Sequence, residues 1–164
     1  MLAGTVFPLL DVSHLHRMQK HILIADDDDD DLEIFMEAAR NSDLPIRVTP
    51  VNSCKAIFDH IGTGDLPHMI IIDGVLSPNS VYDNILALKE DQRLEGIPLI
   101  VLSGSDQALI KTTCYAAGIN LYLQKQTSFS ATTEIIKRLY HIDWSSTTTL
   151  TAREFNELPL PSFA

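Results

Sequence analysis

Five short apolar runs rich in Ile, Val and Leu alternate along this chain with longer segments of helical period. Such alternation is typical of a parallel sheet whose strands are joined by crossover helices. Three of the runs are apolar without polar alternation, as expected for central strands covered on both faces. Pro50 interrupts the second run, and because proline is tolerated chiefly in edge strands, we expect that strand at an edge. The runs are HILIA (21–25), IRVTPV (46–51), HMIIID (68–73), PLIVLS (98–103) and LYLQ (121–124).

The segments between these runs carry apolar residues at helical spacing, which predicts one helix after each strand. We expect the fourth helix to begin near Asp106 as its N-cap and to end just before Gly118. Five such units predict an α/β fold: a doubly wound five-stranded parallel sheet, flavodoxin-like with strand order 2-1-3-4-5, with helices on both faces and a ligand crevice outside the carboxyl ends of the strands. The expected apolar helical residues are Leu32, Phe35, Met36, Ala39, Ala56, Ile57, Ile61, Ile85, Leu88, Ile135, Ile136 and Leu139.

One domain accounts for most of the 164 residues, because a chain of this length has enough core for one domain and little room for a second. We expect this domain to span residues 20–142. Residues 1–19 are interpreted as a loose amino-terminal extension, since Met18 would make a natural start before the first strand. Residues 143–164 are interpreted as a short carboxy-terminal tail, too small to form an output domain such as a DNA-binding domain.

The balance of charge limits the expected partners. The formal net charge is −10 with only 12 Lys and Arg residues, which argues against nucleic acid as a ligand. The apolar runs are too short to cross a bilayer, so no membrane association is expected. Cys54 and Cys114 lie far apart without a metal-binding spacing, which favours reduced, structural thiols in a cytoplasmic protein. His14 and His16 could hold a metal ion, but the loose extension explains them more simply.

Six consecutive aspartates, Asp26 to Asp31, directly follow the first apolar run. An acidic run is usually solvated or disordered, but this one is flanked by apolar segments on both sides. Carboxylates gathered at the carboxyl end of a strand suit a hard, oxygen-seeking cation such as Mg²⁺. A calcium-binding EF-hand loop is excluded, because Asp31 stands where that loop requires glycine.

Polar side chains also follow the other central strands. Asp73 ends the third run, Ser103 ends the fourth and Lys125 follows the fifth. Since the carboxyl ends of parallel strands meet at one edge of the sheet, we expect these residues to lie beside Asp26 and Asp27. Three carboxylates can bind a divalent ion, and a lysine with a hydroxyl can hold the oxygens of a transferred phosphoryl group.

With these motifs in this order, residues 20–142 resemble the receiver domain of bacterial response regulators (CheY-like). The similar segments are the acidic pair after ILIA, HMIIID, IPLIVLSGS and AAGINLYLQK. The resemblance implies that Asp73 is the phosphorylated aspartate and that the cofactor is Mg²⁺ or Mn²⁺. It further implies that Asp27 and the backbone carbonyl of Val75 are direct metal ligands and that Asp26 acts mainly through a metal-bound water. Ser103 and Lys125 would contact the phosphoryl group. Tyr122 would be the aromatic residue that rotates in the switch.

The function implied is that of a stand-alone receiver in a two-component phosphorelay. Such a protein accepts a phosphoryl group from the phosphohistidine of a histidine kinase or phosphotransfer protein and changes conformation to alter partner binding. It is a signalling protein and promotes only its own phosphorylation and dephosphorylation. The tail is weakly similar to those of regulators paired with phytochrome-type kinases, which makes a homodimer possible. Asp28 to Asp31 are then expected to cap the first helix and complement its positive end.

The sequence departs from the receiver pattern at three places. Gln126 stands where proline usually follows the lysine, so the Lys125–Gln126 bond is either cis, at a cost of about 2.5–4 kcal/mol, or trans with Lys125 aimed differently. The loop after Asp73 is long and contains Pro78, and Asn84 replaces a common glycine. Ser103 stands where threonine is commoner and keeps the hydroxyl.

The departures leave an alternative function open, a receiver-like interaction module that acts independently of phosphorylation. Retention of Asp27, Asp73, Ser103 and Lys125 speaks against it, because a scaffold has no physical need for all four. A haloacid-dehalogenase-type phosphatase would need a threonine after the acidic motif and would leave Asp73 unexplained. A flavin carrier of the same fold would need a Ser/Thr-rich phosphate loop after the first strand.

Overall fold

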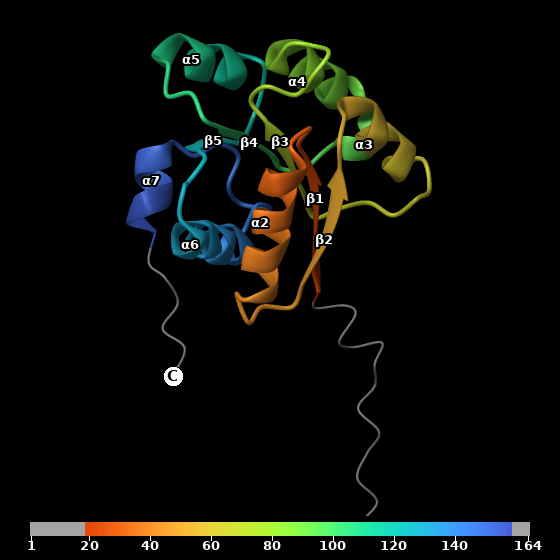
Figure 1. The fold of residues 1–164 in the computed structure, drawn as a ribbon. Coiled ribbons are helices and arrows are strands. Elements are labelled where there is room, and N and C mark those ends of the chain that lie inside the picture. The colour runs from red at the N-terminus through yellow and green to blue at the C-terminus, as the bar shows by residue number, and fades with distance from the viewer. Residues whose placement is uncertain (1–18, 159–164) are drawn as a thin grey trace, which may run out of the picture.

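The computed structural model describes residues 19–158 and contains a five-stranded parallel sheet in the order β2-β1-β3-β4-β5 (Figure 1). The predicted topology is confirmed. The strands are β1 (Lys20–Ala25), β2 (Ile46–Val51), β3 (Met69–Asp73), β4 (Leu99–Ser103) and β5 (Leu121–Gln124). The helices are α2 (Asp29–Arg40), α3 (Cys54–Ile61), α4 (Val81–Glu90), the 3₁₀ turn η1 (Gln92–Leu94), α5 (Ala108–Ala116), α6 (Phe129–His141) and α7 (Ala152–Glu157).

The sheet separates two apolar cores. Helices α3, α4 and α5 cover one face, and α2, α6 and α7 cover the other (Figure 1). Successive residues of a strand face opposite cores: in β3, Ile70 and Ile72 pack on the first face and Met69 and Ile71 on the second. Burial of each such Ile side chain stabilises the fold by about 1.5–3 kcal/mol. The unbroken apolar runs of the central strands therefore reflect burial on both sides, as predicted.

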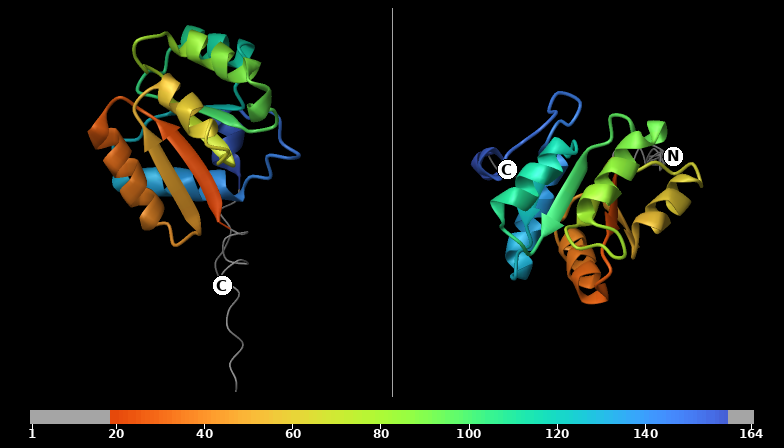
Figure 2. Two further views of the ribbon diagram at one scale, coloured as in Figure 1. Left: turned by 90° about the vertical axis from the view of Figure 1, so that its right-hand side faces the viewer. Right: turned by 90° about the horizontal axis from the view of Figure 1, so that it is seen from above.

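Strand β2 lies at an edge of the sheet, as Pro50 predicts. It pairs with β1, with Pro50 opposite Ile24, and Figure 2 shows α2 on one side of these two strands and α3 on the other. The register places the carboxyl ends of the strands at nearly the same level. Ala25 is paired with Ile72, and Ser103 is paired with Gln124. The residues that follow β1, β3, β4 and β5 consequently meet at one edge.

The helix ends show where local chemistry was predicted correctly and where it was not. Asp28 caps α2 by accepting hydrogen bonds from the amides of Asp30 and Asp31, as expected. The prediction that Asp106 caps α5 is wrong: Gln107 is the N-cap, and the Asp106 carboxylate pairs instead with Lys111. Gly118 follows the end of α5 with a φ of 100°, which confirms its expected place.

Residues 143–158 fold back onto the sheet. Leu150 forms a parallel bridge with Leu121 of β5, and its amide donates to the carbonyl of Asn120 at 2.8 Å. Phe155 of α7 is fully buried in the core that α2 and α6 also cover. The described part of the carboxy-terminal tail therefore adds a helix and core contacts to the domain.

The expected loose extension, residues 1–19, lies almost entirely outside the described residues. Within residues 19–158, none of the helices combines the length and the apolar character needed to span a bilayer.

Candidate functional site

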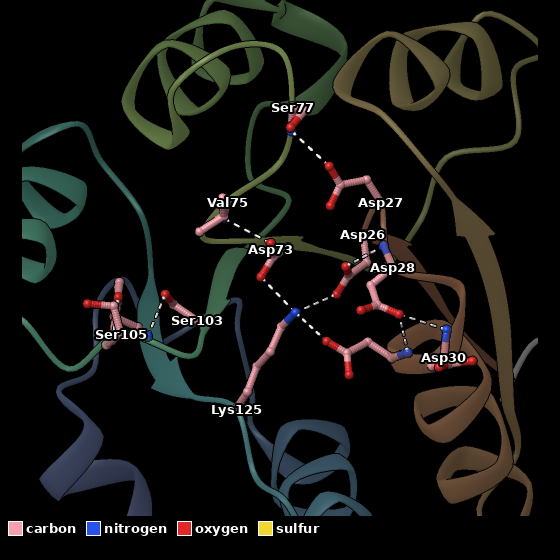
Figure 3. Close-up of polar contacts among 12 residues, drawn as sticks. Asp26, Asp27, Asp28, Asp30, Asp73, Val75, Ser77, Ser103, Ser105 and Lys125 are labelled. Carbon is pink, nitrogen blue, oxygen red and sulfur yellow. Dashed lines mark hydrogen bonds and ion pairs between the residues drawn. The ribbon is translucent and has the colours of Figure 1, made fainter.

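Lys125 lies at the centre of a group of carboxylates at the carboxyl ends of the strands (Figure 3). Its Nζ is 2.8 Å from Asp26 Oδ2 and 2.8 Å from Asp73 Oδ1. Asp26 follows β1, Asp73 ends β3 and Lys125 follows β5, so three strands deliver the group. The side chains of Asp26 and Asp73 are only 6% and 8% exposed, so these ion pairs are well shielded from water.

Asp31 is a third partner of Lys125 that sequence reasoning missed. Its Oδ2 lies 2.7 Å from Lys125 Nζ, although its place in the first turn of α2 suggested only a helix-capping role. From this position its negative charge also complements the positive amino-terminal end of α2. Nothing in a run of six aspartates distinguishes the one whose side chain reaches across to the lysine.

Burial and pairing shift the pKa values of the central groups. Burial raises the pKa of Asp26, and the hydrogen bond from Lys125 opposes that shift. Burial by itself would lower the pKa of Lys125, but hydrogen bonds to Asp26, Asp31 and Asp73 raise it above its ordinary value. Lys125 is therefore a permanent cation at neutral pH.

Backbone amides orient the carboxylates (Figure 3). The amide of Asp28 donates to Asp26 Oδ1 at 3.0 Å, and the amide of Val75 donates to Asp73 Oδ2 at 2.9 Å. Asp27 is more exposed, and its Oδ2 accepts from the amide of Ser77 at 3.4 Å. Each carboxylate is thus fixed by the turn that follows its strand or by the neighbouring loop, which leaves oxygen lone pairs available to a cation.

The arrangement fits a divalent cation. One oxygen from each of Asp26, Asp27 and Asp73 lies within 4.8 Å of the other two, and hard ions such as Mg²⁺ bind through carboxylate and carbonyl oxygens. Lys125 supplies one positive charge to this group and to Asp31, so negative charge remains in excess. The Val75 amide contacts Asp73, whereas the proposed metal contact of the Val75 carbonyl stays a prediction.

Ser103 is buried at the end of β4, and its Oγ accepts a hydrogen bond from the Ser105 amide at 3.1 Å. Gly74, directly after Asp73, is the second residue that sequence reasoning missed. A Cβ at Gly74 would lie 2.4 Å from Ser103 Oγ, far inside contact distance. Glycine is therefore required for the Asp73 turn and the Ser103 hydroxyl to approach one another.

Tyr122 is connected to the same loop. Its ring is 1% exposed, and its hydroxyl donates to the Ser105 carbonyl at 2.9 Å. Ser105 thus bonds Ser103 through its amide and Tyr122 through its carbonyl. The predicted switch role of Tyr122 stays a prediction, but a physical link to Ser103 exists.

The sequence departures have simple local outcomes. The Lys125–Gln126 peptide is trans, and Lys125 still reaches Asp73; the cis peptide within residues 19–158 is Ser77–Pro78. Asn84 is buried, and its Nδ2 donates to the carbonyl of Leu76 at 3.1 Å. In place of glycine, this asparagine therefore ties the long loop after Asp73 to α4.

Comparison with known proteins adds relatives and structural neighbours. No protein-family model matches the chain. The two-component response regulator ORR5 of Oryza sativa subsp. japonica is 27% identical over 119 residues, covering 73% of this chain and 87% of ORR5. The phosphorylated cyanobacterial phytochrome response regulator RcpA superposes with a TM-score of 0.68 at 26% identity, covering 80% of this chain and 98% of RcpA. The Mn²⁺-bound form of the response regulator Rcp1 gives 0.65 at 21% identity, covering 81% and 99%.

Proposed function

We propose that this chain acts as a response-regulator receiver domain, a role that its fold and its similarity to response regulators support, and that Asp73 accepts a phosphoryl group from the phosphohistidine of a histidine kinase or phosphotransfer protein. The observation that carries the proposal is the 2.8 Å contact between Lys125 Nζ and Asp73 Oδ1 inside an otherwise acidic group. Asp73 is buried, is paired with Lys125 and lies beside Asp26 and Asp27. Once a divalent cation binds these carboxylates, Asp73 can approach an anionic phosphoryl donor.

The transfer forms a new P–O bond at an Asp73 carboxylate oxygen and breaks the P–N bond of the phosphohistidine. The histidine nitrogen keeps the bonding electron pair. Phosphoryl transfer asks the protein mainly for positioning and charge stabilisation. The Val75 amide orients the Asp73 carboxylate by donating to Oδ2, and the Lys125 ammonium group contacts the other oxygen, Oδ1.

A divalent cation such as Mg²⁺ or Mn²⁺, held by Asp26, Asp27, Asp73 and the Val75 carbonyl, would offset the repulsion between the anionic nucleophile and the anionic donor. The chemistry of the donor set supports this assignment, because all the side-chain ligands are carboxylates. The Mn²⁺-bound form of Rcp1 provides a parallel on the same fold.

The conformational response would begin at Ser103. If its hydroxyl turns to donate to the new phosphoryl group, its oxygen can still accept from the Ser105 amide and pull that residue inward. Ser105 then moves with the phosphoryl group, and Tyr122 follows because its hydroxyl is bonded to the Ser105 carbonyl. Phosphorylation would therefore shift the population of loop conformations through differential contacts.

The test is the intact mass of the protein after incubation with acetyl phosphate, in Mg²⁺ or in EDTA. We expect a phosphate adduct that requires Mg²⁺ and is absent from Asp73→Asn. Asp59→Asn is the matched control, because Asp59 is an exposed aspartate paired with Lys55 on α3, and its adduct should be unchanged. Absence of the adduct from the folded parent protein would contradict the proposal and favour the phosphorylation-independent interaction module.

A further inference from the structure

A second group of metal-ligating side chains lies at the opposite, amino-terminal end of the sheet. We call it the histidine cluster; it consists of His21 in β1, His60 in the last turn of α3, and Asp65 in the loop before β3. One ligand atom from each residue lies within 4.8 Å of the other two. His21 Nδ1 is 3.6 Å from Asp65 Oδ1, and His60 Nε2 is 3.6 Å from Asp65 Oδ2.

Both imidazoles direct an unused nitrogen into the cluster. The His21 side chain is 2% exposed and that of His60 is 17% exposed. His21 Nδ1 and His60 Nε2 are both buried, and neither has a hydrogen-bond partner within residues 19–158. Buried polar atoms are normally satisfied, so two such nitrogens beside one carboxylate form a candidate binding site.

The second nitrogen of His21 contacts a hydroxyl that can either donate or accept a hydrogen bond. His21 Nε2 lies 2.9 Å from Thr49 Oγ1, which can accept a hydrogen bond from the Nε2–H. In the tautomer that carries its proton on Nε2, the lone pair sits on Nδ1, facing Asp65. Metal-binding histidines are usually held in this way, through a hydrogen bond from the nitrogen that does not touch the metal.

His21 is also neutral under ordinary conditions. Burial, followed by the positive charge of Arg47, lowers the pKa of His21 to about 4, while Asp65 opposes that shift. A neutral imidazole is the form that binds a metal ion.

We propose that His21, His60 and Asp65 bind a transition-metal ion of the zinc class, with water as the fourth ligand. Two ligands about 2.0–2.1 Å from a tetrahedral zinc ion lie roughly 3.4 Å apart, close to the 3.6 Å that separates each imidazole nitrogen from one of the two Asp65 oxygens. Two nitrogen donors and one carboxylate match zinc, whereas the all-carboxylate group around Asp73 matches Mg²⁺. The Asp65 side chain is 43% exposed, which gives an ion and its water a route from solvent.

Arg47 orients the carboxylate of this site. Its guanidinium binds Asp65 through two contacts, Nη1 to Oδ2 at 2.7 Å and Nη2 to Oδ1 at 2.8 Å. Each carboxylate oxygen retains a lone pair for a metal. The positive charge of Arg47 opposes an incoming cation, so replacement by Gln should tighten zinc binding while removal of a ligand should weaken it.

The experiment is a calorimetric titration of the full chain with Zn²⁺ in an excess of Mg²⁺. His14 and His16 are replaced by Ala in every sample, because they offer a second pair of imidazoles. We expect one zinc ion per chain, binding about tenfold or more weakly in His60→Ala. His141→Ala is the matched control, since His141 also ends a helix, and it should bind zinc like its parent.

Asp65→Asn provides an independent ligand variant, and imidazole ¹⁵N shifts on adding Zn²⁺ should move at His21 Nδ1 and His60 Nε2. The proposal is overturned if the folded parent binds no zinc, or if His60→Ala and His141→Ala bind it equally well. It is also overturned if zinc binding survives His60→Ala but is lost in Asp27→Asn, because the ion would then occupy the carboxylate group at the other end of the sheet.

Discussion

The two ends of the sheet hold buried polar side chains in opposite ways. At the carboxyl end, Asp26, Asp31 and Asp73 surround the single ammonium of Lys125, and negative charge remains in excess. At the amino end, His21 is buried as a neutral base and its Nδ1 has no partner among residues 19–158. One end is an acidic group around a single lysine, and the other combines two imidazoles with one carboxylate. The comparison teaches that burial alone does not define a binding site. The kind of ion that a site can bind depends on the chemistry and protonation state of its buried side chains.

The largest effect is expected from removing the one cation of the carboxylate group. Lys125→Met leaves Asp26 and Asp73 buried without their partner, which should lower the free energy of unfolding by about 4 kcal/mol in EDTA. Mg²⁺ should restore part of that loss by supplying positive charge. Urea denaturation with and without Mg²⁺ measures both effects. Lys111→Met is the control, because its partner Asp106 is exposed, and a comparable loss there would contradict the account.

The histidine cluster gives the next largest effect, which appears as a pH dependence. His21 has a folded pKa of about 4 against 6.5 in the unfolded chain, so between these values the unfolded chain binds more protons. Stability should therefore fall as the pH drops from 6.5 to 4, by up to about 3 kcal/mol from this group. Burial is the largest cause of this shift, and Arg47, Asp65 and His60 modify it.

Urea denaturation across that pH range, in parallel for the parent and His21→Gln, isolates the contribution. The glutamine variant keeps a polar side chain beside Thr49 but cannot titrate, so its curve should be flatter. Equal slopes in the two proteins would show that His21 is not buried as a neutral base.

The close contact between Gly74 and Ser103 provides a further test at the carboxyl end of the sheet. Gly74→Ala places a Cβ 2.4 Å from Ser103 Oγ and should cost about 2 kcal/mol of stability by overpacking. The matched control is Gly104→Ala, because no heavy atom among residues 19–158 lies within 4 Å of a Cβ built there. Chemical denaturation of both variants decides the point, and equal stability would mean that the turn after Asp73 relaxes freely.

The smallest expected effect is a gain in stability. Asp27→Asn removes one negative charge from a group that already carries an excess, and should stabilise the protein in EDTA by about 0.5 kcal/mol. The same change should abolish most of the thermal stabilisation that the parent gains from Mg²⁺, since a proposed ligand is lost. Differential scanning fluorimetry with and without Mg²⁺ tests both halves, and undiminished Mg²⁺ stabilisation would remove Asp27 from the ligand set.

The topology and the principal site residues could be predicted because both depend on order along the chain. Asp26, Asp73, Ser103 and Lys125 meet because parallel strands end at one edge, whatever the details of their side chains. Asp31 and Gly74 could not be predicted in this way, since their roles depend on side-chain reach and on a 2.4 Å approach. Such distances are fixed by tertiary packing.

Two further outcomes show what local signals can and cannot tell. Asp106 has the right residue type for an N-cap, but Lys111 on the same helix competes for its carboxylate. For α7 the signal was present: Thr151 and Glu154 form a capping box, a pattern visible in TARE. The histidine cluster gave no such signal, because its members come from separate elements and only the fold brings them together.

The bridge between Leu150 and Leu121 means that both borders of the sheet are guarded against other chains. Exposed strand edges recruit foreign strands and promote aggregation. At one border, Pro50 withholds an amide from any strand that would pair beside β2; at the other, the residues around Leu150 already occupy the backbone next to β5. A partner that adds a strand at β5 must first displace this segment, so its binding would begin with the release of a piece of the protein's own backbone.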